Sequence, residues 1–131
     1  MPIHREPFLA HVQERGEYGT TEEADRAARV VLALLGAHLV GTVRAELAAR
    51  LPETCALTLI NPLPASEPLS PDRFVRATAA WIEGATEKTA LWDIGAVLST
   101  EAAAAGDTLT REILLQLPPG HDLLFGHRRP T

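Results

Sequence analysis

An internal repeat is the sequence feature that most restricts the fold. Residues 8–58 align with residues 74–124 without a gap, at a constant offset of 66 positions. Many of the identical residues are apolar or lie in turns, which indicates two tandem copies of one structural unit. We expect the two copies to superpose, related by an approximate two-fold axis. The identical pairs include Phe8/Phe74, Thr20/Thr86, Ala24/Ala90, Val31/Val97, Leu32/Leu98, Thr42/Thr108, Glu46/Glu112, Leu51/Leu117, Pro52/Pro118 and Leu57/Leu123.

A proline-rich segment separates the copies. Residues 61–70 contain Pro62, Pro64 and Pro68, which fix φ and remove backbone donors, so we expect an extended linker between repeats 8–60 and 74–126. A chain of 131 residues fits one domain and can bury about two-thirds of the surface that its unfolded form exposes. The prediction is therefore a single domain, residues 1–131, in which two units of three to four helices pack as one helical bundle.

Capping residues and helical periodicity define the first two helices of each unit. Pro7 and Pro71 suit the first position of a helix, and Ser70 can cap the second of these. Thr20 with Glu23 forms a capping box for the next helix. These signals predict helices over residues 7–16, 20–39, 71–82 and 86–105. The helices 20–39 and 86–105 are apolar on most sides, so we expect them to lie at the centre.

The third helix of each unit is expected to begin near Thr42 or near Asp107 and Thr108, where a side-chain oxygen can cap the first turn. Pro52 and Pro118 would end these helices. Helical turns over residues 57–60 and 123–125 would close the units. The sequence has no alternating pattern long enough for strands, which makes the expected fold class all-α.

Charge, cysteine content and hydropathy exclude several classes of protein. The formal net charge is −5, and neither half has the basic footprint of a nucleic-acid binder. Cys55 is the only cysteine, which rules out an internal disulfide, and its apolar surroundings predict a buried structural thiol. No apolar run approaches the roughly 20 residues of a membrane span. The N-terminus does not read as a secretory signal, so we expect a cytoplasmic protein.

Several segments together resemble one family of bacterial proteins. Phe8-Leu9, the run from Val31 to Gly36, the run from Leu47 to Pro52, and Leu114 to Pro118 followed by Leu124-Phe125-Gly126 are similar to the family of domain of unknown function 2267 (DUF2267). The resemblance implies an all-α protein of a kind common in actinobacteria. It implies no settled activity. The chain departs from the family at the entry to both third helices and at Glu101, where the family residue is apolar.

No catalytic motif stands out. The chain has no phosphate loop, dinucleotide fingerprint, nucleophile elbow or HExxH motif, so an enzyme is disfavoured, and no cofactor is expected. His11 and Glu14 have a spacing that could place two metal ligands on one helical face, but as an isolated pair they indicate a solvated surface rather than a metal site. The helices either side of Gly41 resemble a helix-turn-helix, yet they offer too few arginines to read DNA.

Glu101 is the most unusual charged residue, because its helical angle places it among Val97, Leu98 and Ala105. An unpaired ionised carboxylate at such a position is costly. Three outcomes are open: the helix end exposes it, Arg76 or Arg111 pairs with it, or it is protonated in a pocket as a functional acid. We expect partial exposure or an arginine partner.

Two tryptophans replace arginines of the first copy: Trp81 aligns with Arg15, and Trp92 aligns with Arg26. Trp81 follows Phe74 by seven residues, so we expect it to join the edge of the core. Trp92 points away from the core sector, and an exposed indole often anchors an interface. We therefore expect Trp92 to be covered by the other unit, by the linker or by a second molecule.

Two classes of function remain open. The first is a non-enzymatic helical protein-interaction module that self-associates or docks onto a protein partner, with Trp92, Trp81 and Glu101 as candidate binding residues. The alternative is a small-molecule-binding or catalytic domain whose pocket lies between the two repeats and uses Glu101 or Asp93. A flat apolar patch would favour the first class, and a concave pocket with convergent polar groups the second.

Overall fold

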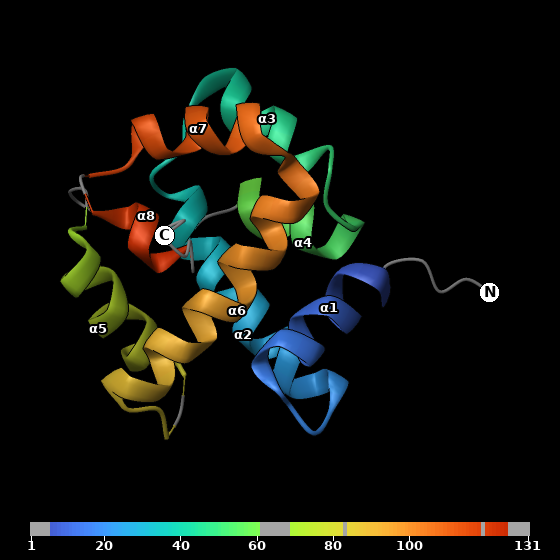
Figure 1. Ribbon diagram of the computed structural model, residues 1–131, viewed down its shortest axis with the longest axis vertical. Coiled ribbons are helices and arrows are strands. Elements are labelled where there is room, and N and C mark those ends of the chain that lie inside the picture. Colours follow the sequence, from blue (N-terminus) through green and yellow to red (C-terminus); the bar gives the residue numbers. More distant parts are fainter. Residues whose placement is uncertain (1–5, 61–68, 83, 119, 126–131) are drawn as a thin grey trace, which may run out of the picture.

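The computed structural model describes residues 6–60, 69–82, 84–118 and 120–125, and within them the chain is helical and has no strand. Figure 1 shows the central helices α2 (Thr21–Gly36) and α6 (Glu87–Ala105), with α6 passing in front of α2. The helix α1 (Glu6–Gly16) flanks this pair on one side, and α5 (Pro71–Trp81) flanks it on the other. The all-α fold class is therefore confirmed. The predicted extended linker, residues 61–70, lies almost wholly outside the described residues.

Capping places the starts of the long helices where the sequence predicted them. Thr20 caps α2, and its hydroxyl and the Glu23 carboxylate exchange hydrogen bonds with backbone amides as a capping box. Ser70 caps α5, with Pro71 in the first turn, and Thr86 caps α6. These caps satisfy amides that a helix start leaves without a partner.

The shorter helices begin without side-chain caps, contrary to the prediction. They are α3 (Gly41–Ala48) and α7 (Asp107–Gln116), which lie side by side at one end of the molecule (Figure 1), and neither has a capping hydroxyl or carboxylate. Val40 and Gly106 occupy the cap positions, and Gly106 has φ 86°. A glycine at this left-handed φ turns the chain directly from α6 into α7, so Asp107 and Thr108 are already in the first helical turn.

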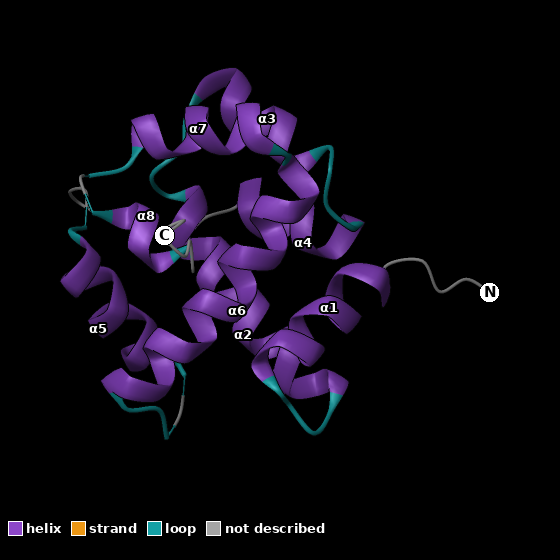
Figure 2. Ribbon diagram, viewed as in Figure 1, coloured by secondary structure: helices purple, strands orange, loops and turns teal. Residues whose placement is uncertain are grey.

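The last helices differ in length. The predicted turn at residues 57–60 is the end of a longer helix, α4 (Glu53–Ile60), whereas α8 (His121–Leu124) is a single turn. Both are drawn in purple with the other helices in Figure 2. The α4 helix packs closely on the C-terminal end of α2, because Gly36 leaves space for the Leu59 backbone: a Cβ at Gly36 would lie 2.1 Å from the Leu59 carbonyl oxygen.

The core extends through both halves of the chain as one cluster. Phe8 and Phe74 are both buried, as predicted from the sequence, and α1 and α5 each pack on both central helices. Matched positions at the offset of 66 are buried in pairs: Val12/Thr78, Ala24/Ala90, Ala28/Ile94, Val31/Val97, Leu32/Leu98, Leu35/Glu101, Leu39/Ala105, Leu47/Ile113, Leu51/Leu117 and Cys55/His121. None of the described helices is long and apolar enough to cross a bilayer.

Candidate functional site

The outer face of α6 lines a groove that continues onto α5 and α8. One hollow of about 630 Å³ lies over Trp92 and Ser99, between Arg15 of α1 and Leu123 of α8. A second hollow, of about 740 Å³, extends from there towards Val75 of α5. Both hollows are lined by Lys88, Leu91, Leu123 and Leu124, so we treat them as one feature, the α6 groove.

Helical spacing creates the α6 groove. Lys88, Trp92 and Ser99 recur on one face of α6, and the small Gly95 between them leaves open space where a Cβ would stand. Large apolar side chains stay accessible around that space: Leu91 is 49% exposed, Trp92 53% and Leu123 67%. Half-exposed apolar side chains that gather in a concavity are typical of an interaction site.

Trp92 is partly covered by the other half of the chain. Its indole Nε1–H donates a 2.9 Å hydrogen bond to the Gly16 carbonyl at the end of α1, while the rest of the ring stays half exposed. One of the expected modes of cover, by the first unit, is thus present in part. Because the polar edge of the indole is already bonded, its exposed surface offers mainly apolar contact.

Trp81 does not join the core, and that prediction is wrong. It is the last residue of α5 and is 57% exposed, whereas the next residue, Ile82, is buried at this end of the helix. Trp81 is also absent from the lining of the α6 groove described above.

The residue after Trp92 makes a second contact with the α1–α2 turn. The Tyr18 hydroxyl donates a 2.5 Å hydrogen bond to the Asp93 carboxylate, and the backbone passes through Glu17 at φ 56° to reach it. Burial raises the pKa of Asp93, and the hydrogen bond from Tyr18 and the charge of Arg26 lower it in part. Burial, together with Asp93, also raises the pKa of Tyr18. Trp92 and Asp93 therefore hold α1 against α6.

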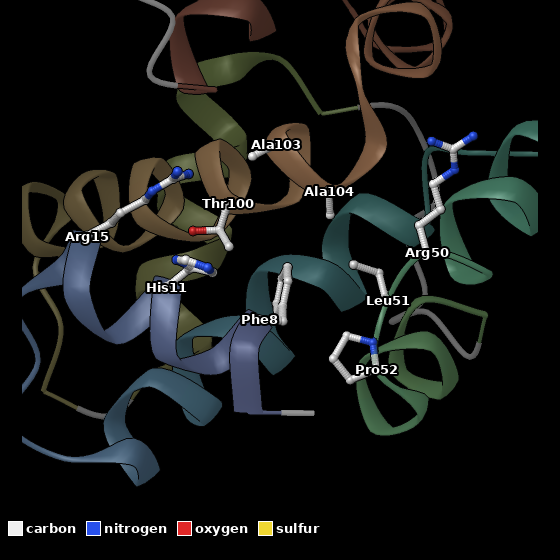
Figure 3. A pocket seen from close by; sticks show the side chains of 9 residues that line it. All are labelled: Phe8, His11, Arg15, Arg50, Leu51, Pro52, Thr100, Ala103 and Ala104. Carbon is white, nitrogen blue, oxygen red and sulfur yellow. The ribbon is translucent and has the colours of Figure 1, made fainter. Parts of the chain in front are cut away.

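A separate pocket of about 590 Å³ lies between the halves, and we call it the seam pocket. Figure 3 shows His11, Arg15 and Thr100 gathered at one end and Arg50 at the other. The wall between them is apolar, and all the residues that line the pocket are Phe8, His11, Arg15, Arg50, Leu51, Pro52, Thr100, Ala103 and Ala104. No carboxylate is among them. The two acids expected to serve a pocket between the repeats, Glu101 and Asp93, do not line it.

Glu101 is fully buried, so the expectation of partial exposure or an arginine partner is wrong. It is 0% exposed, and neither carboxylate oxygen has a hydrogen-bond partner. Burial raises the pKa of Glu101 from 4.5 to about 8, which keeps the side chain mostly neutral at pH 7. The α6 helix continues for another turn beyond it, to Ala105, rather than fraying. Because no hollow described above reaches it, burial alone does not make it a functional acid.

Two histidines surround Phe74 in the second half. The ring centroids of His38 and His121 lie 5.9 and 5.5 Å from that of Phe74. His38 Nε2 accepts the Leu69 amide at 2.8 Å, so its Nδ1 carries the proton that bonds the Leu34 carbonyl at 2.8 Å. Burial lowers the pKa of His121, whose Nε2 has no hydrogen-bond partner. This cluster is a packed part of the core and ties residue 69 to α2.

Metal and thiol chemistry find no support in the described residues. They contain no group of three or more His, Cys, Asp or Glu side chains that could hold a metal ion. His11 Nδ1 lies 4.0 Å from Glu14, and both side chains are largely exposed. Cys55 is buried, and burial raises the pKa of its thiol to about 11, consistent with the predicted structural role.

The sequence did not predict that the residues of the seam pocket come together. Arg15, Arg50 and Thr100 are far apart in the chain and belong to no motif. The available signal was a departure from the repeat: Trp81, Gln116 and Leu34 stand at the matched positions.

The fold and these sites define a small all-α protein with two central helices, an apolar groove on one of them and a cationic pocket beside it. The model of the family described as uncharacterized conserved protein (DUF2267) matches residues 5–124, nearly the whole chain. The chain belongs to the DUF2267 family, which confirms the resemblance seen in the sequence. None of the curated proteins compared with the chain matches it.

Proposed function

We propose that this protein is a non-enzymatic interaction module that binds an acidic amphipathic helix of a protein partner in the α6 groove. The observation that carries the proposal is the cluster of half-exposed Leu91, Trp92 and Leu123 around the open space at Gly95. An amphipathic helix recognises such a groove through apolar anchors spaced at i, i+3, i+4 and i+7. A tryptophan at the centre is a common energetic anchor of such interfaces.

The charged residues around Trp92 favour an acidic partner helix over a basic one. The hollow over Trp92 has Arg15 and Lys88 in its wall and no acidic side chain, whereas the adjoining hollow also contains Asp72 and Glu87. The hollow over Trp92 is therefore cationic within a chain whose formal charge is −5. A partner helix with carboxylates beside its apolar face would meet these cations, whereas the same two cations would repel a basic helix. Such complementarity favours specificity and association rate more than affinity.

We infer that the module consists of two copies of one helical unit, related by an approximate two-fold axis. The inference is supported by the starts of α2 and α6, and of α3 and α7, which lie 66 residues apart, and by the pairs of buried residues at that offset. An experimental structure whose halves superpose with a rotation far from two-fold would contradict it. We also propose that the protein works in the cytoplasm of a bacterium, where the free thiol of Cys55 suits a reducing environment.

The test uses Trp92 as the reporter. In a Trp81→Phe background, a peptide of leucines at helical spacing with glutamates elsewhere is titrated while acrylamide quenching of the remaining indole is measured. Binding should protect Trp92 from quenching, and the protection should weaken as salt rises, because Arg15 and Lys88 are exposed. The matched peptide with lysines in place of glutamates should not bind. Leu123→Ala should reduce binding without changing the fold, because Leu123 is 67% exposed.

Two results would contradict this function. Equal protection by the acidic and basic peptides would remove the argument from charge. A mass by light scattering that doubles with protein concentration, with Trp92 protected in the absence of peptide, would show that a second copy of the chain occupies the groove instead.

A further inference from the structure

The structure assigns a second binding site to the seam pocket, for a small amphiphilic anion: a carboxylate with an aliphatic tail. The site is independent of the α6 groove except for Arg15, which lines both. Its volume of about 590 Å³ lies within the range of roughly 300–1,000 Å³ usual for small-molecule pockets.

The polar end of the seam pocket fits an anion. Arg15 and His11 project from consecutive turns of α1 towards Thr100 of α6 (Figure 3). Arg15 has neither a hydrogen bond nor an ion pair with any residue that the structure describes, so its guanidinium is available to a ligand carboxylate, which it can bind in a bidentate manner. Thr100 donates its hydroxyl proton to the Ala96 carbonyl at 2.8 Å and therefore supplies no donor to a ligand carboxylate, which leaves Arg15 to bind the charge.

The remaining wall fits an aliphatic tail. Phe8, Leu51, Pro52 and Ala104 line it, and Phe8 and Leu51 are held in place by the core. At the far end, Arg50 already donates a 2.6 Å hydrogen bond to the Ala105 carbonyl, which caps the C-terminal end of α6. Arg50 therefore has one N–H group bonded to the protein whereas Arg15 has none within the described part of the chain, and this asymmetry favours binding of the ligand carboxylate at Arg15.

At the positions that match the seam pocket at the offset of 66, a larger side chain of the protein takes the place of the open space. His38 matches Ala104, and its ring centroid lies 5.9 Å from that of Phe74, which matches Phe8. Gln116 replaces Arg50 and bonds the backbone of Val40. The small Ala104 on α6, and the cations on α1, therefore distinguish the seam pocket from the matched place in the other half.

Isothermal titration calorimetry with octanoate, 1-octanol and octylammonium tests the site on the full chain. Octanoate should bind at one site, 1-octanol more weakly and octylammonium not at all. Arg15→Gln should weaken octanoate binding about tenfold or more, which is typical of losing a charge-assisted hydrogen bond. The matched control is Arg29→Gln, an exposed arginine paired with Asp25 away from the pocket, which should leave binding unchanged.

Three further variants locate the ligand and separate this site from the α6 groove. Ala104→His introduces the ring found at the matched position 38 and should block octanoate, whereas Leu123→Ala lies in the groove alone and should not affect it. Ala103→Ser, on the pocket wall, should keep octanoate binding and serves as the control for a changed α6 surface. Amide chemical shifts of Thr100 and Ala104 should move on titration. Absence of octanoate binding, equal binding of octylammonium, or equal losses in Arg15→Gln and Arg29→Gln would overturn the assignment.

Discussion

The two halves of the chain bury matched positions but place different chemistry at them. Leu35 on α2 and Glu101 on α6 are both 0% exposed, and Cys55 and His121 form a second pair of this kind. Both halves bury a side chain at these places. In the second half, the ionisable Glu101 and His121 stand at these positions, and burial favours their neutral forms. The comparison therefore separates burial, which both halves share, from the chemistry of the side chain, which differs between them.

The two seams differ in the same way. The turn after α1 bonds α6 twice, through Gly16 to Trp92 and through Tyr18 to Asp93. At the matched positions the turn after α5 has Ile82 and Gly84, which offer no phenol, and α5 packs on α2 less extensively than α1 packs on α6. Exchanging residues between matched positions therefore tests which differences matter.

The largest effect is expected at Glu101. Glu101→Leu gives α6 the residue that α2 has at the matched position 35, and it removes a buried carboxyl group without a partner. Stability at pH 7 should rise by about 3 kcal/mol, because one pKa unit corresponds to about 1.4 kcal/mol. Urea denaturation measures the change. Glu112→Leu, at an exposed glutamate, is the control and should change stability by less than about 0.5 kcal/mol.

The pH dependence of the stability tests the same burial of the Glu101 carboxyl group. The pKa of Glu101 is about 8 in the folded chain against 4.5 for an ordinary glutamate, so the unfolded chain loses this proton first as pH rises. The stability is therefore fully present below pH 4.5 and falls as pH rises towards 8. In Glu101→Gln this fall should disappear. A wild-type stability that is unchanged, or that rises, between pH 5 and pH 8 would show that the carboxylate reaches water or a cation.

A smaller effect is expected where α2 meets α4. Gly36→Ala places a methyl group 2.1 Å from the Leu59 carbonyl oxygen, a clash with backbone that only a shift of α4 can relieve. A loss of roughly 2 kcal/mol is expected from overpacking, in spite of the better helix propensity of alanine. At the matched position 102 the chain already has alanine, and Ala102→Gly should cost only about 1 kcal/mol. Equal thermal stability of Gly36→Ala and wild type would contradict the close approach.

The hydrogen bond between Tyr18 and Asp93 is a difference between the two halves that a single substitution can test. Tyr18→Phe leaves the half-buried carboxylate without its hydrogen bond and should cost about 1 to 2 kcal/mol. It should also raise the pKa of Asp93 further, since that hydrogen bond lowers it, so the loss should grow as pH rises through the new pKa. A double-mutant cycle with Asp93→Asn isolates the pair. A coupling near zero would mean that apolar packing alone holds α1 on α6.

The sequence predicts most of the fold and less of the sites. The starts of α2, α5 and α6 follow from Thr20, Ser70 and Thr86, because side-chain caps act locally. The burial of Glu101 could not be predicted in the same way, since it depends on how far α6 continues beyond it and on what packs around it. The seam pocket forms where small residues of α6 pack opposite cations of α1. No local sequence pattern predicts such a tertiary arrangement.

The smallest effect is expected at Trp81, the site where sequence reasoning placed an indole in the core. Trp81→Arg introduces the residue that α1 has at the matched position 15, and the side chain is 57% exposed at the end of α5. Stability should therefore change by no more than about 0.5 kcal/mol, because surface substitutions away from caps and buried networks rarely do more. Trp92→Arg should cost more, since it removes the hydrogen bond to Gly16 as well as half-buried surface. Urea denaturation of the two variants side by side decides the matter, with far-UV circular dichroism to confirm that both remain helical. If Trp81→Arg proved the more damaging of the two, the Trp81 indole would have to pack against the core rather than lie exposed at the end of α5.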